Sequence, residues 1–136
     1  MSTAATETLS VVVEREIAHP PEKIWRALTQ PHLLAEWLME NDFKPAVDHR
    51  FSLSGDWGAA DCTVLTVEPN RTLSYTWDAM GLESTVTLTL TPTGKGTHLR
   101  MEQAGFRPDQ LQKYNGAKFG WQKFFGKLEE VLARER

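Results

Sequence analysis

Three carboxylates lie beside predicted turns, where they could rim the mouth of a pocket: Asp56, Asp78 and Glu83. Two such groups could share general acid–base work if a pocket removed them from water. Carboxylates in loops are far more often solvated, and no G-x-S-x-G, P-loop or dinucleotide-binding sequence accompanies these. Segment 94–97 matches only the last letters of a phosphate loop and falls in a predicted hairpin turn. The residues therefore favour a binding protein, with an enzyme as the alternative.

The four histidines and the single cysteine are scattered, which argues against a metal site. No two histidines have the i, i+4 spacing of helical metal ligands, and none clusters with Cys62. Asp61 beside Cys62 would raise the pKa of the thiol, so we expect this cysteine to serve as a small buried hydrophobic residue. One cysteine also excludes an internal disulfide framework and fits a reducing compartment. We predict no metal and no cofactor.

Five tryptophans in 136 residues suggest a different chemistry, the stacking of an apolar ligand. Burial of one tryptophan contributes roughly 4–6 kcal/mol at ~25 cal/mol per Å², so a place in the core is the default. Trp25 and Trp121 occupy helical positions expected to pack inward, whereas other tryptophans lie near loops or at a strand end. The candidates for lining a ligand cavity are Trp37, Met39, Phe43, Phe51, Trp57, Cys62, Tyr75, Trp77, Met80, Leu82, Tyr114, Ala117, Gly120 and Trp121.

One long helix over residues 108–136 is the element expected to position many of these side chains. Its apolar residues recur at steps of three, four or one, which is typical of one broad helical stripe. They are Leu111, Tyr114, Ala117, Trp121, Phe124, Phe125, Leu128, Val131 and Leu132. Gly116 and Gly120 share one side of this helix and Gly126 follows, although each glycine costs about 1 kcal/mol relative to alanine there. These glycines indicate either tight packing on a sheet or free volume beside the helix.

The remaining elements predict an antiparallel sheet. Residues 9–18 alternate as a half-buried strand, with Val12 on the polar face and Arg15 on the apolar face as exceptions. Two short proline-initiated helices follow, and residues 41–48 are expected to form an irregular or edge strand. From residue 50 to 102, alternating segments are separated by turn signals every 8–12 residues. This order predicts an α+β fold in which the long helix covers the apolar face of the sheet.

Length and composition bound the class of protein. We expect a single domain over residues 9–136 behind a flexible segment 1–8. The chain is 40% hydrophobic and 24% charged, and its net charge of −3 offers no basic stripe for nucleic acid. No apolar run approaches the ~20 residues of a membrane span, and the N-terminus lacks the secretory pattern. We therefore expect a soluble cytoplasmic protein, monomeric or weakly dimeric.

Short stretches spread over almost the whole chain after Thr8 resemble one known family. They are residues 15–20, Ile24-Trp25, Leu28-Thr29, Leu33-Leu34, Trp37, 64–69, Leu73, 75–77, Gly96-Thr97, Leu99, Gly105-Phe106, Gly120-Trp121 and Leu128. In this order they are similar to the helix-grip superfamily, also called START-like or SRPBCC. More narrowly, the chain resembles the family of the activator of heat-shock protein 90 ATPase. Met39 departs from the pattern, because relatives often carry another aromatic or apolar group there.

The resemblance implies a curved sheet of about six or seven strands wrapped round the C-terminal helix, with an apolar pocket between them. It implies no particular reaction, because members include ligand carriers, small-molecule resistance proteins, cyclase-like enzymes and co-chaperone domains. We expect a protein that holds a small apolar or aromatic molecule in this pocket. The alternatives are an enzyme that uses the same pocket for cyclisation, dehydration or hydrolysis, and a co-chaperone of heat-shock protein 90.

The co-chaperone is the less favoured alternative. The resemblance presents the chaperone activator as a longer protein whose separate N-terminal domain makes much of the contact, and the residues before Leu9 are too few for a domain. A stable interface also needs about 800 Å² per partner with aromatic or arginine anchors at its centre. In this sequence, folding is expected to bury most of the aromatic residues.

Overall fold

A computed structural model describes residues 8–56 and 58–134 of the protein. Its elements, in order, are β1 (Leu9–Ile17), α1 (Pro21–Thr29), α2 (Pro31–Trp37), β2 (Glu40–Asn41), β3 (Arg50–Gly55), β4 (Gly58–Glu68), β5 (Thr72–Ala79), β6 (Leu82–Pro92), β7 (Thr97–Phe106), the 3-10 helix η2 (Pro108–Gln110) and α3 (Leu111–Arg134). The predicted order of one strand, two short helices, six strands and a long helix is confirmed. Trp57 and most of the expected flexible segment 1–8 lie outside the described residues.

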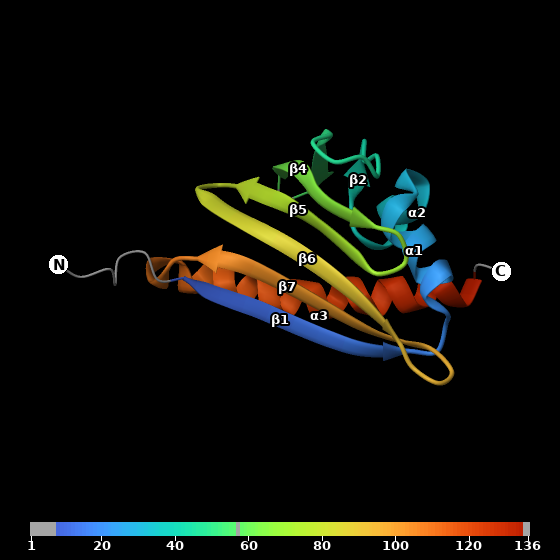
Figure 1. The fold of residues 1–136 in the computed structure, drawn as a ribbon. Helices are drawn as coiled ribbons and strands as arrows, with labels where there is room; N and C mark the ends of the chain where they lie inside the picture. Colours follow the sequence, from blue (N-terminus) through green and yellow to red (C-terminus); the bar gives the residue numbers. More distant parts are fainter. Residues whose placement is uncertain (1–7, 57, 135–136) are drawn as a thin grey trace.

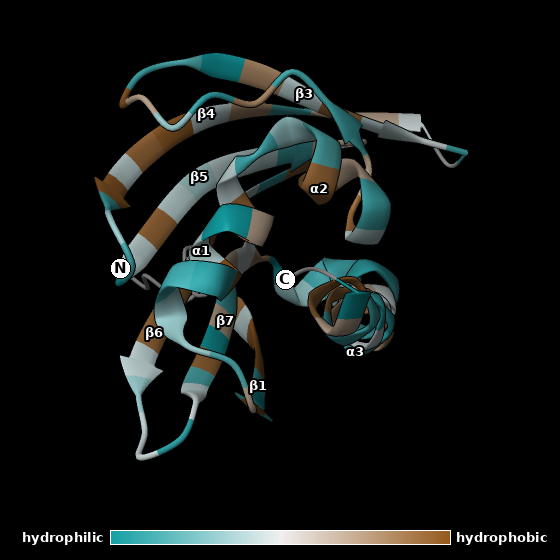
Figure 2. Ribbon diagram, turned by 90° about the vertical axis from the view of Figure 1, so that its right-hand side faces the viewer, coloured by the Kyte–Doolittle hydropathy of each residue, from teal (hydrophilic) through white to brown (hydrophobic). Residues whose placement is uncertain are grey.

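The seven strands form one antiparallel sheet in the order β1-β7-β6-β5-β4-β3-β2. Sequential hairpins build it from β2 to β7, and β1 closes the far side by pairing with β7. Figure 2 shows the sheet as an open arc with α3, seen almost end-on, on its concave side. Figure 1 shows the same helix running along the sheet over most of its length. This is the α+β helix-grip arrangement that the sequence predicts.

The long helix α3 is buried along only part of its length. From Trp121 onward it supplies Trp121, Phe125 and Leu128 to the core, and helices α1 and α2 also pack against it. Its first half is much less covered: Leu111 is 55% exposed and Phe119 is 69% exposed. The predicted stripe is therefore correct from Trp121 onward and wrong at Leu111, because the two short helices reach only the second half of α3.

Arg15, the exception on the apolar face of β1, connects that strand to α3. Its guanidinium donates to the backbone oxygen of Gln122 over 3.2 Å and to the side-chain oxygen of Gln122 over 2.9 Å. It also pairs with the carboxylate of Glu129 at 3.4 Å. An arginine is thus tolerated on the inner face because the polar side of α3 lies opposite it.

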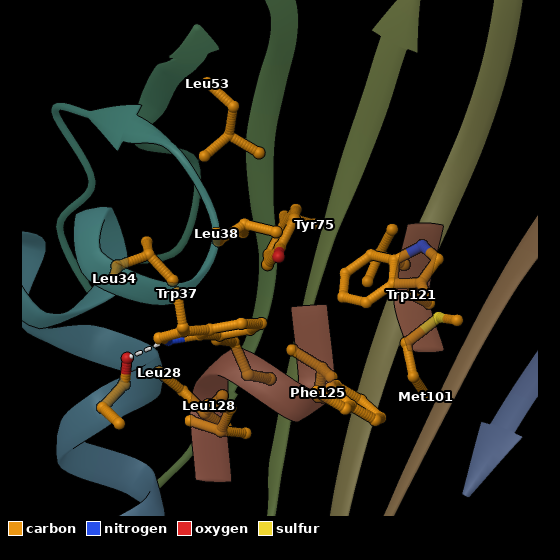
Figure 3. Packing of buried hydrophobic residues seen from close by; sticks show 14 of the residues in the cluster. Leu28, Leu34, Trp37, Leu38, Leu53, Tyr75, Met101, Trp121, Phe125 and Leu128 are labelled. Carbon is orange, nitrogen blue, oxygen red and sulfur yellow. Dashed lines mark hydrogen bonds between the residues drawn. The ribbon is translucent and has the colours of Figure 1, made fainter. Parts of the chain in front are cut away.

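Trp37 joins the three helices at the centre of the core (Figure 3). Its indole N–H donates to the backbone oxygen of Ala27 over 2.8 Å, which fixes α2 against α1. Its ring centroid lies 6.3 Å from that of Phe125 on α3. Burial of so large a side chain, with its polar atom satisfied, makes Trp37 a structural residue.

Two sequence-based expectations need adjustment. Of the irregular or edge strand expected at 41–48, only Asn41 lies in a strand, as the second residue of β2. Leu9 is partly exposed at the start of the edge strand. Within residues 8–56 and 58–134, no helix combines the length and apolar character needed to cross a membrane.

Candidate ligand-binding cavity

An apolar cavity of about 330 Å³ lies between the first half of α3 and the inner face of strands β5, β6 and β7. Its lining residues are Met39, Trp77, Ala79, Met80, Leu82, Gln103, Phe106, Lys113, Gly116, Ala117, Gly120, Trp121 and Phe124. This volume is near the lower end of the ~300–1,000 Å³ found for small-molecule sites. The cavity is therefore large enough for a small ligand.

The hairpin between β5 and β6 forms one edge of the cavity. Ala79 pairs with Leu82, and the two residues between them, Met80 and Gly81, have φ of 53° and 85°. Positive φ at both central positions is the geometry of a tight type I′ hairpin, for which a non-glycine residue such as Met80 is unusual. The turn places Met80, which is 71% exposed, at the mouth of the cavity.

The glycines of α3 form the opposite wall. A Cβ atom added to Gly116 or Gly120 would meet no heavy atom of the described residues within 4 Å outside its own stretch of helix. Of the two explanations that the sequence left open, tight packing is therefore wrong at these positions and free volume is correct. The absence of side chains at Gly116 and Gly120 leaves room in the cavity between α3 and the sheet.

A bulge in β7 turns Phe106 into the cavity. Strict alternation from Met101 and Gln103 would place residue 105 inward, but the register of β7 against β1 shifts at this point. Gly105 has φ of 121°, and a Cβ there would lie 2.5 Å from the backbone oxygen of Glu83. Glycine is required by both the backbone angle and the close approach. The bulge thus adds an aromatic ring to the lining.

Gln103 is a buried amide in this apolar wall, 2% exposed. Its side-chain oxygen accepts a hydrogen bond from the indole N–H of Trp121 over 2.9 Å. Its side-chain nitrogen donates to the hydroxyl of Ser84 over 3.0 Å, and that hydroxyl donates to the backbone oxygen of Trp77 over 2.7 Å. The chain of bonds fixes the position of Trp121, whose ring centroid lies 5.8 Å from that of Trp77.

The described lining contains no aspartate, glutamate or histidine, and its one charged residue is Lys113. The carboxylates singled out in the sequence lie elsewhere. Asp78 and Glu83 face each other across β5 and β6 as an exposed pair on the outer side of the sheet, and Asp56 is exposed in the β3–β4 turn. These carboxylates are exposed to solvent, so they do not provide the desolvated acid–base pair that a catalytic cavity would need.

Seven of the fourteen candidate residues come together in the cavity: Met39, Trp77, Met80, Leu82, Ala117, Gly120 and Trp121. Six others are not among its lining residues: Trp37, Phe43, Phe51, Cys62, Tyr75 and Tyr114. Tyr114 is half-buried with its ring against Phe106, at 5.7 Å between centroids. Trp57 lies outside the described residues.

Three of the six pack into a separate aromatic cluster under β3 and β5. The centroids of Phe43 and Phe51 are 5.0 Å apart, and those of Phe51 and Tyr75 are 5.2 Å apart, both edge to face. The Tyr75 hydroxyl is buried and has no hydrogen-bond partner among the described residues. Burial, with a smaller contribution from nearby Cys62, raises the pKa of this hydroxyl. These rings are core residues rather than cavity residues.

Cys62 pairs across the sheet with Phe51 and is buried, as expected for a small hydrophobic residue. Burial, and then the charges of Asp78, Asp61 and Asp42, raises the pKa of the thiol to about 12. A thiol with so high a pKa is a poor nucleophile at neutral pH. In the part of the chain that the structure describes, no three histidine, cysteine or acidic side chains gather in a way that could hold a metal ion.

Six lining residues escaped the sequence-based candidates: Ala79, Gln103, Phe106, Lys113, Gly116 and Phe124. Helical spacing could have found three of them, because Lys113, Gly116 and Phe124 form a series with Gly120 whose successive steps are three, four and four residues. Alternation along β7 could have identified Gln103 as a polar residue on the inner face. The bulge that turns Phe106 inward has a weaker signal, a single glycine in a strand.

The family model described as Activator of Hsp90 ATPase homolog 1-like protein matches residues 18–133. Among curated proteins, no significant match is found. Protein MLL2253 from Mesorhizobium loti, a solved crystal structure, is 65% identical to this chain with a TM-score of 0.91. The alignment covers 94% of this chain and 99% of that protein.

Two further solved structures share the fold at lower identity. CalU16 from Micromonospora echinospora is 26% identical, with a TM-score of 0.81 over 94% of this chain and 78% of its own. DynU16, a protein in the dynemicin biosynthetic locus, is 26% identical, with a TM-score of 0.82 over 92% of this chain. The chain spans 47% of DynU16, about half of its length. Because the family model matches most of this chain, the chain belongs to the family described as Activator of Hsp90 ATPase homolog 1-like protein.

Proposed function

We propose that this protein binds a small, largely apolar molecule with an aromatic ring in the cavity between α3 and strands β5–β7. The observation that carries the proposal is the pair of glycines at the cavity wall. Gly116 and Gly120 each cost about 1 kcal/mol in a helix interior. No described residue packs closely enough to require either one, and both line the cavity. Open space in the cavity beside the helix accounts for both.

The aromatic side chains around that space support an aromatic ligand. Trp77 and Trp121 meet at a tilt of 58°, and Phe124 stands edge to face with Trp121 at 5.5 Å. Phe106 and Trp77 belong to the sheet side, while Trp121 and Phe124 belong to the helix. Offset and edge-to-face ring contacts are each worth about 0.5–1.5 kcal/mol beyond burial. A flat ring between the two walls would make several of them.

The chemistry of the lining favours binding over acid–base catalysis. Gln103 already uses its oxygen and its nitrogen in hydrogen bonds to Trp121 and Ser84. Neither amide atom of Gln103 titrates, and Lys113 is the one ionisable side chain among the described lining residues. The place of DynU16 in a biosynthetic locus agrees with a small-molecule ligand for a relative of this fold.

The test is a fluorescence titration with N-phenyl-1-naphthylamine, a neutral aromatic probe. We expect saturable one-to-one binding, and we expect Trp77→Ala to weaken it more than Trp25→Ala. Trp25 is a matched control because it is a partly buried tryptophan of α1 that does not line the cavity. Circular dichroism establishes that both variants are folded equally. A panel of apolar aromatic probes that gives no saturable response overturns the proposal.

A further inference from the structure

The cavity has a charged mouth as well as an apolar interior. Lys113 is exposed, and it is the one charged residue among the described side chains of the lining. The acidic residue one turn earlier, Asp109, is engaged by the guanidinium of Arg107 at 3.3 Å. In the part of the chain that the structure describes, none of the ion pairs includes Lys113. The ammonium group of Lys113 therefore lies at the edge of the apolar cavity without an ion-pair partner among the described residues.

The other lysines near this end of α3 are differently placed. The ammonium group of Lys118 lies 5.7 Å from the centroid of the Tyr114 ring, and that of Lys123 lies 5.6 Å from the Phe119 ring. Both thus have an aromatic partner of the cation–π kind on their own helix. Neither lines the cavity. Lys113 differs from them because it lines the cavity and makes no cation–π contact with a ring of the described residues.

We propose that the natural ligand is an aromatic acid, with its ring system in the cavity and its anionic group paired with Lys113 at the mouth. This inference rests on the proposed function, whose cavity it uses. Lys113, Gly116 or Ala117, Gly120 and Phe124 follow one another at helical spacing along one side of α3, so the cation lies at one end of the row. From residue 113 to Trp121 the helix rises about 12 Å, which suits a body of two or three rings.

Two probes with the same apolar body, one neutral and one anionic, distinguish the contribution of the Lys113 charge to binding from that of the apolar cavity. 8-Anilinonaphthalene-1-sulfonate is N-phenyl-1-naphthylamine with an added sulfonate. An exposed ion pair changes affinity by about two- to five-fold, and salt screens it. At low ionic strength we expect 8-anilinonaphthalene-1-sulfonate to bind about two- to five-fold more tightly than N-phenyl-1-naphthylamine. Added salt should lower the affinity for the sulfonate and leave the affinity for the neutral probe unchanged.

Substitutions of two lysines locate the effect. Lys113→Gln should bring the two probes to equal affinity, and Lys113→Glu should reverse their order. Lys118→Gln is the matched control, since it removes the same charge five residues away without touching the lining. It should leave the preference for the sulfonate intact. In Gly120→Leu the affinities for both probes should fall together, by about ten-fold or more, as expected if they share the cavity.

Each result decides the proposal. Equal affinities of the two probes for the unaltered protein overturn the aromatic-acid inference while the proposed function stands. Equal losses in Lys113→Gln and Lys118→Gln also overturn it, because the attraction would then come from the general charge of the helix. Failure of both probes to bind overturns the proposed function and the inference together. A preference that only Lys113 variants abolish supports the anionic ligand.

Discussion

The indole N–H of Trp121 donates a hydrogen bond to the side-chain oxygen of Gln103 over 2.9 Å. Both side chains are buried, and the bond joins α3 to β7 across the floor of the cavity. Figure 3 shows Trp121 of α3 beside Met101, which belongs to β7 as Gln103 does. The hydrogen bond satisfies the one polar atom of a large ring that would otherwise be free to tilt into the cavity.

Replacement of Gln103 by leucine should therefore destabilise the protein. The change leaves the buried Trp121 N–H without an acceptor, and an unsatisfied buried donor costs about 1–3 kcal/mol. Urea denaturation measures this loss in the free energy of unfolding. Tyr75→Phe is the control, because it removes a buried hydroxyl that has no partner among the described residues, and it should leave stability equal or higher. Unchanged stability in Gln103→Leu would count against the proposed role of the bond.

Gly120→Leu should close the cavity without unfolding the protein. A side chain at this position enters open space, and leucine favours the helix over glycine by about 0.5–1 kcal/mol. We expect stability to be equal or higher and the affinity for N-phenyl-1-naphthylamine to fall by about ten-fold or more. Gly126→Leu makes the same change in the same helix away from the lining and should keep the probe bound. A loss of about 1–3 kcal/mol in Gly120→Leu would instead indicate overpacking.

Periodicity predicts which residues share a face but not how far along that face a neighbour reaches. Tyr75 and Trp77 stand two residues apart on the inner face of β5, yet only Trp77 lines the cavity. Figure 3 shows Trp37 and Leu38, from the α2 region, beside Tyr75. The short helices thus cover one end of the strand and leave the other end open. The prediction that Leu111 is buried is wrong for the same reason, because Leu111 belongs to the apolar stripe but lies beyond the part of α3 that the short helices cover.

The element order was easier to predict than the site, because alternation, prolines and turn residues act locally. The meander from β3 to β7 follows from such signals alone. The cavity depends on the curvature of the sheet and on the distance between α3 and β7, which no short stretch encodes. Helix glycines are the local sign that comes closest, but they are compatible with tight packing as well as with space. Only the positions of the residues around these glycines distinguish tight packing from free space.

The family description raises the question of chaperone activation. We predict that this chain does not raise the ATPase turnover of heat-shock protein 90 at micromolar concentration. The exposed large apolar residues of the described chain are spread over several elements, among them Val12 on β1, Leu65 on β4 and Phe119 on α3. A stable interface concentrates aromatic or arginine anchors at one centre. A steady-state ATPase assay is the measurement, and a several-fold saturable rise would contradict us.

A pH-sensitive pair of contacts lies on the outer face of β1 and β7. His98 contacts the carboxylate of Glu14 at 2.7 Å through Nε2 and that of Glu16 at 2.5 Å through Nδ1. The hydrogen bonds to Glu16 and then to Glu14 raise the pKa of His98 above its usual 6.5. His19 is an internal comparison, since partial burial and then Lys23 lower its pKa. In an NMR titration we therefore expect His98 to lose its proton at higher pH than His19.

The raised pKa also fixes the sign of the effect on stability. Because the folded state holds the proton on His98 more tightly than the unfolded state, the stabilisation is fully present below pH 6.5 and is lost as pH rises through the higher folded pKa. The double variant Glu14→Gln, Glu16→Gln should move the His98 midpoint back toward 6.5 and leave His19 unchanged. Since both carboxylates are exposed, salt should shift His98 in the same direction. A His98 midpoint at or below that of His19 in the unaltered protein would show that the two carboxylates do not hold the proton.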